Sequence, residues 1–281
     1  MSQLFTTIYL MGGLGNQLFQ IFTTISYAIK MGKNFGFLNV KRVDKRQSFW
    51  NTFFKSINVY LYNNLPADLY IIKEQNCDFN ELSIIELNKP NVCIYGYFQS
   101  YKYFQENYTQ ICNILNITNM REQLINITNH KYSFVNSIGM HFRLGDYKYK
   151  QQYHPLATYT YYENSLKYIK NKNKNINYTI YYFCEEEDIS TVMKTINQLQ
   201  LKFPNYIFCR GGEELNDEDQ LLLMSCCSNN IIANSTYSWW SAYLNENKSK
   251  IVCYPSVWFG EEYKNKNTSD ICPLEWIKIN G

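Results

Sequence analysis

The sequence predicts an α/β protein with a doubly wound parallel sheet in its second half. In the second half of the chain, short apolar segments of strand length alternate with segments of helical periodicity, which is typical of a doubly wound parallel sheet. Near the N-terminus a glycine-rich turn separates a buried strand from an amphipathic helix. The chain has 281 residues, more than one compact core usually holds. We therefore expect one large domain or two lobes.

The first predicted element is a strand at residues 8–11, followed by a Gly-Gly-Leu-Gly-Asn loop at residues 12–16. Residues 17–30 carry apolar side chains at helical spacing and end next to Gly32, which predicts a helix with a glycine at its C-terminal end. The dinucleotide fingerprint Gly-x-Gly-x-x-Gly is not met, because Leu18 occupies the third glycine position. A nicotinamide or flavin enzyme is therefore disfavoured.

The rest of the first half is less periodic. Residues 92–100 indicate a buried strand with a polar end, and residues 101–124 indicate a helix. Residues 125–137 contain several Asn, Thr and Ser side chains and a histidine, so we place the boundary between the lobes there.

Residues 138–143 alternate strictly, which predicts a strand with one apolar face. His141 and Arg143 would project together from the other face, and Gly145 and Asp146 would form the turn that follows. Because the planar fork of arginine matches two oxygens of a phosphate, this strand end is a candidate anion site. The alternative is a surface strand in which Arg143 pairs with Asp146.

The remaining segments alternate between helix and strand. We predict helices at residues 159–170, 189–200, 217–224 and 239–245, and strands at residues 178–184, 206–209, 230–233 and 251–254. The short connections between them favour parallel strands.

Two strand ends in this half carry further candidate residues. Residues 234–238 (Asn-Ser-Thr-Tyr-Ser) lie where a strand meets a helix, and backbone N–H groups there are suited to hold a phosphate. Ordinary helix capping is the alternative. Glu185 and Glu186 end the 178–184 strand, and a carboxylate there is able to accept hydrogen bonds from the N1–H and amino group of guanine. A solvated acidic turn is the alternative.

The sequence predicts no metal site. The Asp-Glu-Asp triplet at residues 217–219 matches a pattern that holds Mn²⁺ or Mg²⁺ on nucleotide diphosphates, but it also opens a helix, where acidic side chains favourably oppose the dipole. Nine cysteines and three histidines show no zinc-ligand spacing. A reduced, cytoplasmic protein fits this pattern best.

Composition excludes several classes of protein. The net charge is only +3, which gives no support to nucleic-acid binding. Hydrophobic residues make up 46% of the chain, enough for a substantial core. No segment approaches the roughly 20 apolar residues of a membrane span, and no signal segment is evident, so we expect a soluble protein.

Four segments together resemble glycosyltransferase family 11, the α-1,2-fucosyltransferases. Residues 141–147 (His-Phe-Arg-Leu-Gly-Asp-Tyr) are similar to the family motif His-x-Arg-x-Gly-Asp-Tyr, and residues 234–240 (Asn-Ser-Thr-Tyr-Ser-Trp-Trp) are similar to its Asn-Ser-Thr-aromatic-Ser-Trp-Trp motif. Residues 12–20 look like its N-terminal signature, and residues 96–104 resemble its Gly-Tyr-aromatic-Gln-Ser stretch. The matches occur in order and span most of the chain.

The resemblance implies a GT-B fold, an α/β fold of two Rossmann-like lobes with a ligand cleft between them. Residues 1–130 would be the acceptor side, and residues 131–281 would bind the nucleotide-sugar donor. The enzyme would move L-fucose from GDP-β-L-fucose to a sugar hydroxyl, commonly C2 of galactose, with inversion and without a metal or other cofactor. Arg143, assisted by His141, would neutralise the leaving diphosphate.

The resemblance also implies roles for other residues. A phosphate cradle would form at Asn234, Ser235, Thr236 and Ser238; guanine contacts at Glu185 and Glu186; and sugar or acceptor contacts at Gly13, Asn16 and Gln17. Asp146 is a candidate base for the acceptor hydroxyl, or else a structural residue of its turn. The family usually has Phe-Ser-Asp-Asp where residues 183–186 are Phe-Cys-Glu-Glu, so the two carboxylates are one methylene longer here.

Two alternative functions remain open on the sequence. One is a transferase that uses another GDP-sugar. The other is a non-catalytic carbohydrate-binding protein, because 26 Tyr and 5 Trp residues supply many stacking surfaces. Neither the acceptor glycan nor an oligomeric state follows from the sequence.

Overall fold

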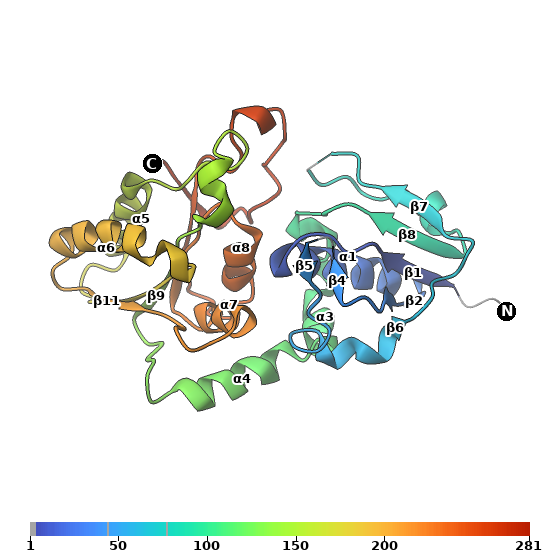
Figure 1. The fold of residues 1–281 in the computed structure, drawn as a ribbon, viewed down its shortest axis with the longest axis horizontal. Coiled ribbons are helices and arrows are strands. Elements are labelled where there is room, and N and C mark those ends of the chain that lie inside the picture. Colours follow the sequence, from blue (N-terminus) through green and yellow to red (C-terminus); the bar gives the residue numbers. More distant parts are fainter. Residues whose placement is uncertain (1–3, 44, 77) are drawn as a thin grey trace. The chain divides into compact units, whose positions relative to one another are not determined.

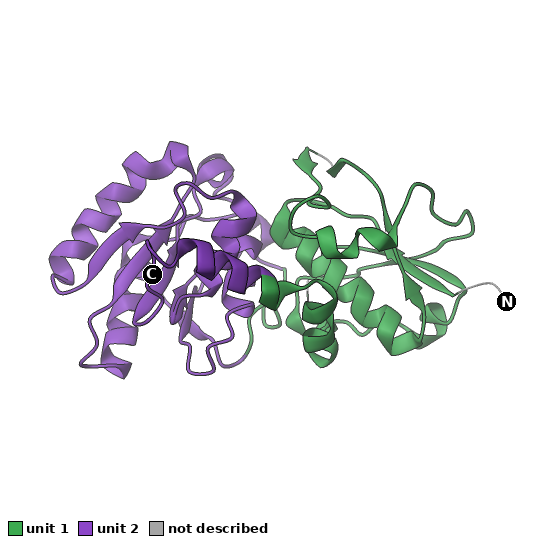
Figure 2. Ribbon diagram, turned by 90° about the horizontal axis from the view of Figure 1, so that it is seen from below, with its two compact units in different colours: residues 1–119, 266–273 green, residues 120–265, 274–281 purple. Residues whose placement is uncertain are grey.

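The computed structural model describes residues 4–43, 45–76 and 78–281 (Figure 1). Two compact units make up the chain (Figure 2): unit 1 contains residues 1–119 and 266–273, and unit 2 contains residues 120–265 and 274–281. Each unit has its own parallel sheet. Among the helices of the described residues, none is both long enough and apolar enough to cross a membrane.

Unit 2 is built on a six-stranded, doubly wound sheet. Its strands are β9 (Ser137–His141), β10 (Thr179–Phe183), β11 (Ile207–Arg210), β12 (Asn229–Ile231), β13 (Val252–Pro255) and β14 (Ile277–Ile279). All neighbours are parallel, in the order β11-β10-β9-β12-β13-β14. The strand order therefore reverses between β9 and β12. The predicted parallel sheet is confirmed, and the three-residue β14 is an additional strand that the sequence analysis did not predict.

Helices cover both faces of this sheet. They are α5 (Tyr159–Lys172), α6 (Ile189–Lys202), α7 (Asp217–Ser225) and α8 (Thr236–Tyr243). Side chains of α5 and α6 form one core with Ile138 and Met140 of β9. On the opposite face, α7 packs so closely that a Cβ at Gly139 would lie 2.7 Å from the Met224 side chain. Every residue of β9 is buried, so the prediction of one apolar and one projecting face is wrong: strands of parallel sheets are commonly buried on both faces.

Unit 1 contains a four-stranded parallel sheet in the order β2-β1-β8-β7. Its strands are β1 (Phe5–Ile8), β2 (Asn34–Phe35), β7 (Tyr70–Lys73) and β8 (Asn91–Tyr95). Two small sheets pair β3 (Phe37–Leu38) with β6 (Leu61–Tyr62) and β4 (Arg42–Val43) with β5 (Arg46–Gln47). The first strand lies earlier than the predicted residues 8–11, because the chain leaves the sheet after Ile8 and Tyr9 is exposed.

The helix predicted at residues 17–30 is α1 (Leu14–Met31), which begins one turn earlier than expected. Gly32 ends it in the left-handed conformation, with φ of 61°, as the sequence predicted. Its buried face packs against β1. A short helix, α2 (Ile84–Leu87), precedes β8.

The single helix predicted at residues 101–124 is instead a broken series. Short 3₁₀ turns at Tyr101–Tyr103 and Gln105–Asn107 precede α3 (Tyr108–Ile114) and α4 (Ile117–Thr128). Asn116 separates α3 from α4 because its left-handed backbone, with φ of 59°, is incompatible with a continuous helix.

The boundary between the units lies within α4, between residues 119 and 120, whereas the sequence analysis placed it between residues 130 and 131. Residues 266–273 also return to unit 1, where Asp270 accepts hydrogen bonds from the Lys102 ammonium and the Phe79 backbone N–H. A polar stretch in the sequence indicates a local boundary, but it does not indicate that a distant segment such as residues 266–273 packs on unit 1.

Candidate active site

The candidate site lies where the strand order of unit 2 reverses. β9 and β12 are neighbours with parallel register, so the turns that leave their carboxyl ends emerge at the same edge of the sheet. β10 flanks β9 on its other side, with Phe183 opposite His141. Crevices outside the carboxyl ends of parallel strands, at such a reversal, are where doubly wound folds bind ligands.

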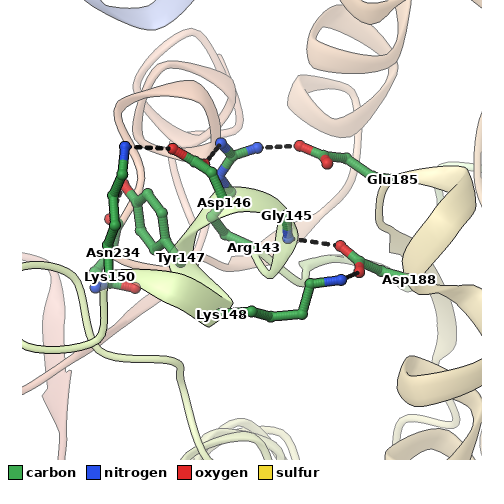
Figure 3. A network of polar contacts seen from close by, with 9 residues as sticks. All are labelled: Arg143, Gly145, Asp146, Tyr147, Lys148, Lys150, Glu185, Asp188 and Asn234. Atoms are coloured by element: carbon green, nitrogen blue, oxygen red, sulfur yellow. Dashed lines mark hydrogen bonds and ion pairs between the residues drawn. The ribbon is translucent and has the colours of Figure 1, made fainter.

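Arg143 lies just beyond β9, between two carboxylates (Figure 3). One guanidinium nitrogen, Nη2, lies 2.6 Å from Oδ1 of Asp146, and the other, Nη1, bonds Oε1 of Glu185. The guanidinium carbon is also 5.0 Å from the centre of the Tyr147 ring. The pairing with Asp146 was one of two interpretations that the sequence left open, and it is present. Both guanidinium nitrogens that form the fork of Arg143 thus bind carboxylate oxygens at this edge of the sheet.

Asp188 fastens the turn that presents Arg143, although the sequence analysis did not select it as a site residue. Its carboxylate is 1% exposed and accepts hydrogen bonds from the Gly145 backbone N–H (2.7 Å) and from Lys148 Nζ (2.6 Å). Gly145 has a φ of 38°. This positive φ favours glycine, and a Cβ there would also lie 2.6 Å from Oε2 of Glu185, which would have to move. The only signal in the sequence was the acidic run that ends at Asp188, directly before a helix.

His141 is buried rather than projecting, with 7% of its surface exposed, and its ring centre is 5.4 Å from that of Tyr237 in α8. Burial, and then the nearby charge of Arg143, lower the pKa of His141 to about 3. Its imidazole is therefore neutral at pH 7 and adds no positive charge beside Arg143. Its Nδ1 is buried and has no hydrogen-bond partner among the residues that the structure describes.

Asn234 follows β12 and holds two loops at the site. Its Nδ2 donates to the carbonyl oxygens of Pro155 (2.9 Å) and Trp258 (3.1 Å). Its buried Oδ1 has no partner within the described ranges. Its backbone carbonyl accepts from the Tyr147 hydroxyl at 3.4 Å, which ties this turn to the one after β9.

Ser235 is the N-cap of α8, but in the described part of the chain its side chain makes no capping hydrogen bond. Ordinary capping by Ser235, the alternative that the sequence left open, is therefore not what this hydroxyl does. Ser238 is buried and donates to carbonyl oxygens of Ala233 and Ser235, both at 3.4 Å. Thr236 lies half-buried in the first turn of the helix. α8 begins at Thr236, soon after the carboxyl end of β12, which is parallel to β9. The positive end of the α8 dipole therefore lies at the same edge of the sheet as Arg143.

Glu185 and Glu186 follow β10 but point to different partners. Glu185 pairs with Arg143, whereas Oε2 of Glu186 accepts from Arg210 Nη2 at 2.5 Å. Arg210 is the last residue of β11, one strand further from the reversal. The structure thus brings Glu185 together with Arg143 and Asp146 and places Glu186 beside β11.

The three N-terminal candidates lie in unit 1. Gly13 is the N-cap of α1, and Asn16 Oδ1 accepts from Gln99 Nε2 at 3.0 Å. Gln17 is fully buried, and its Nε2 donates to the carbonyl oxygens of Gly12 and Gln47, both at 2.9 Å. Gln17 therefore holds the loop in place and is not presented to solvent, whereas Asn16 is half-buried.

The acidic triplet at residues 217–219 forms the first turn of α7, where the Asn216 side chain caps the helix by accepting from the Asp219 N–H at 2.8 Å. Within the described ranges, no group of three His, Cys, Asp or Glu side chains is arranged to hold a metal ion. Eight of the nine cysteines are free thiols, and Cys77 lies outside the described residues.

Three comparisons bear on the family and the fold. A family model described as "Glycosyl transferase family 11" matches residues 2–280. The chain is similar to the Escherichia coli O-antigen biosynthesis glycosyltransferase WbnK, at 32% identity over 68% of this chain and 62% of that protein, less than two thirds of its length. It is also similar to an Escherichia coli alpha-1,2-colitosyltransferase, at 28% identity over 96% of this chain and 97% of that protein.

Among solved structures, the chain is similar to a mutant of Arabidopsis thaliana FUT1 in complex with GDP. The TM-score is 0.55 and the identity 12%, covering 89% of this chain and 70% of that one. At this identity the likeness concerns the fold, and it confirms the α/β, GT-B type expected from the sequence.

Proposed function

Since this chain belongs to glycosyltransferase family 11, we propose that it moves L-fucose from GDP-β-L-fucose to a sugar hydroxyl. The reaction would invert the anomeric centre, need no metal ion, and form an α-1,2 linkage to galactose or a similar sugar. The donor would bind unit 2 at the edge where β9 meets β12.

The position of Arg143 carries this proposal. Its guanidinium lies at the reversal of strand order and is held by carboxylate oxygens from two different turns. A diphosphate presents the same kind of oxygen atoms and gains negative charge as the bond to the sugar breaks. Arg143 would stabilise that charge and so lower the barrier to transfer.

The first turn of α8 supports the same donor. Its N–H groups receive no side-chain cap from Ser235 within the described residues, so they are suited to a phosphate oxygen. The helix dipole adds a favourable interaction with negative charge. Arginine and helix dipole together supply the positive potential that a divalent cation supplies in metal-dependent transferases.

The acceptor hydroxyl loses its proton late in such a reaction, because the transition state has oxocarbenium character. Asp146 is occupied by Arg143 and by Lys150, whose Nζ lies 3.5 Å from Oδ2. We therefore assign Asp146 first to orienting Arg143, and only then to accepting a proton. His141, neutral and buried, would act as a hydrogen-bonding group.

A second donor deserves a direct comparison. The relative that aligns over 97% of its length is an alpha-1,2-colitosyltransferase. This relative favours the α-1,2 linkage and leaves GDP-colitose as the alternative donor. A comparison of kcat/KM for the two donors with the same acceptor decides between them.

Nucleotide binding is the first test, since a ligand that binds only the folded protein raises its melting temperature. We expect a rise with GDP, none with UDP, CMP or NAD, and no change when EDTA is present. Transfer from GDP-L-fucose to lactose, followed by linkage analysis, then tests the reaction. No stabilisation by GDP would contradict the proposal and favour a carbohydrate-binding protein, whereas activity lost with EDTA and restored by Mn²⁺ would contradict metal independence.

A further inference from the structure

The sheet of unit 1 also reverses its strand order, between β1 and β8. The chain leaves β1 into residues 9–13, which lead into the first turn of α1, and leaves β8 into residues 96–100, so the two loops emerge at the same edge. Neither loop takes part in the site of unit 2 described above. Such an edge is a ligand-binding position in its own right.

Gln20 of α1 ties these two loops together. Its Oε1 accepts from the Met11 backbone N–H and its Nε2 donates to the Gly96 carbonyl oxygen, both at 2.9 Å. Gln20 is fully buried. The two loops are therefore held at a fixed separation.

Glu74, the residue after β7, holds the loop after β8 from the other side. Its two carboxylate oxygens accept from the consecutive backbone N–H groups of Tyr97 (2.7 Å) and Phe98 (2.9 Å). The Glu74 side chain fits only because residue 96 is glycine: a Cβ there would lie 2.3 Å from the Cβ of Glu74. A carboxylate that accepts two backbone N–H bonds specifies the loop conformation more strictly than a single bond does.

Phe98 is the strained residue that these bonds hold. Its φ of 52° is left-handed, a conformation that a bulky residue adopts only at a cost in free energy. Its ring is fully buried and packs edge-on against Tyr103 at 5.2 Å. Strain of this kind persists where the surroundings over-determine the conformation, and here the two hydrogen bonds to Glu74 do so.

The conformation of this loop brings Gln99 to Asn16. The Nε2 of Gln99 donates to Oδ1 of Asn16 at 3.0 Å, and both side chains are half-buried at the edge of the sheet. A pair of amides offers both donors and acceptors, which matches the hydroxyls of a sugar. Tyr9 follows β1 and Tyr95 ends β8; they are 41% and 42% exposed, and their ring centres lie 6.4 Å apart in an edge-to-face arrangement. Such rings offer apolar surface to a sugar.

We propose that Glu74 is a positioning residue for the acceptor sugar: it holds residues 97–98 so that the Asn16–Gln99 amide pair meets the acceptor hydroxyls. This inference rests on the proposed function, because it assigns the acceptor to unit 1 while the donor binds unit 2. Glu74 acts through the loop and does not touch the sugar.

The first test replaces Glu74 with glutamine. Glu74→Gln keeps the size of the side chain but leaves one acceptor oxygen for two N–H groups. We expect KM for lactose to rise about tenfold, while KM for GDP-L-fucose and the slow hydrolysis of this donor in the absence of acceptor stay unchanged. The matched control is Glu86→Gln. Glu86 lies in α2 and accepts a hydrogen bond from the hydroxyl of Tyr70, which begins β7, whereas Glu74 follows the other end of β7.

A double-mutant cycle with Gln99→Ala separates positioning from general damage. If Glu74 acts through Gln99, the effect of Glu74→Gln on KM for lactose disappears in the Gln99→Ala background. Additive effects, or equal losses in the donor and acceptor parameters, would overturn the inference.

A third measurement needs no turnover. We expect titration with lactose in the presence of GDP to shift the side-chain amide NMR signals of Asn16 and Gln99 in the wild type. In Glu74→Gln we expect the same shift to need at least a tenfold higher lactose concentration. Unshifted signals in the wild type would overturn the inference. Failure of the wild type to bind GDP or to hydrolyse GDP-L-fucose would instead contradict the proposed function.

Discussion

The backbone N–H of Gly145 donates a hydrogen bond of 2.7 Å to Oδ2 of Asp188, which fastens the turn after β9 to the turn after β10. Lys148 Nζ donates to the other oxygen of the same carboxylate at 2.6 Å. Arg143 and Glu185 stand at the starts of these two turns and pair with each other (Figure 3). A buried carboxylate therefore sets the position of the arginine that we assign to the diphosphate.

Replacing Asp188 tests this support. Asp188→Asn keeps one acceptor oxygen and removes the charge that Lys148 contacts, so we expect a loss of about 1–3 kcal/mol in the free energy of unfolding. Urea denaturation measures it. Glu187→Gln is the control, since Glu187 is an exposed neighbour in the same turn and should change stability by no more than about 0.5 kcal/mol. Equal stability of the two variants would contradict the role of Asp188.

Arg143 should not tolerate lysine. Lysine carries charge but has no planar fork, and Arg143 uses two separate nitrogens toward oxygen atoms. We expect Arg143→Lys to lower kcat for fucose transfer at least about a hundredfold while the melting temperature stays close to that of the wild type. Arg42→Lys, at an exposed arginine of unit 1, serves as the control. A near-normal rate in Arg143→Lys would contradict the role assigned to Arg143 at the diphosphate.

Glu185 pairs with Arg143 and would compete with a diphosphate for it, whereas the sequence predicted a contact between Glu185 and guanine. The Glu185 side chain is 49% exposed, so the pair is partly screened by solvent. We expect Glu185→Gln to tighten binding of inorganic pyrophosphate roughly two- to fivefold, measured by calorimetry at low salt. Weaker GDP binding with unchanged pyrophosphate binding would instead support the guanine contact and contradict the competition.

His141 should make stability depend on pH. Its pKa is about 3 in the folded protein against an ordinary value of 6.5, so the unfolded chain binds a proton more readily than the folded one. The free energy of unfolding should therefore fall as pH decreases from 6.5 toward 3, by up to about 1.4 kcal/mol per pH unit from this group.

The variant His141→Phe isolates this contribution, because the carboxylates that also titrate in that range remain in place. We expect its stability to depend less steeply on pH between 6 and 4 than that of the wild type, as measured by urea denaturation at several pH values. Parallel curves for the two proteins would show that His141 is not buried as a neutral imidazole.

Several features of the fold could be predicted from local sequence alone. The helix α1 and its end at Gly32 follow from apolar spacing and one glycine. The alternation of strands and helices in unit 2 follows from short apolar runs with brief connections, and Arg143 could be selected because it lies close to the end of such a strand. Each of these patterns depends only on residues that are close together in the sequence.

Other features were settled only by tertiary structure. The break at Asn116 reflects a left-handed residue within an otherwise helical pattern. The burial of His141 depends on α8 packing over β9, and the return of residues 266–273 to unit 1 depends on contacts with Lys102 and Phe79. Periodicity does not encode such partners.

The sequence by itself determined the α/β class, the family, and which stretches end at the edge of the second sheet. Tertiary structure decided which partner each charged side chain takes: Glu185 with Arg143, Glu186 with Arg210, and Asp188 with Gly145 and Lys148. Strand order is the physical reason, because β10, β9 and β12 become neighbours only when the sheet assembles. Only then do turns about forty residues apart along the chain come within hydrogen-bonding distance.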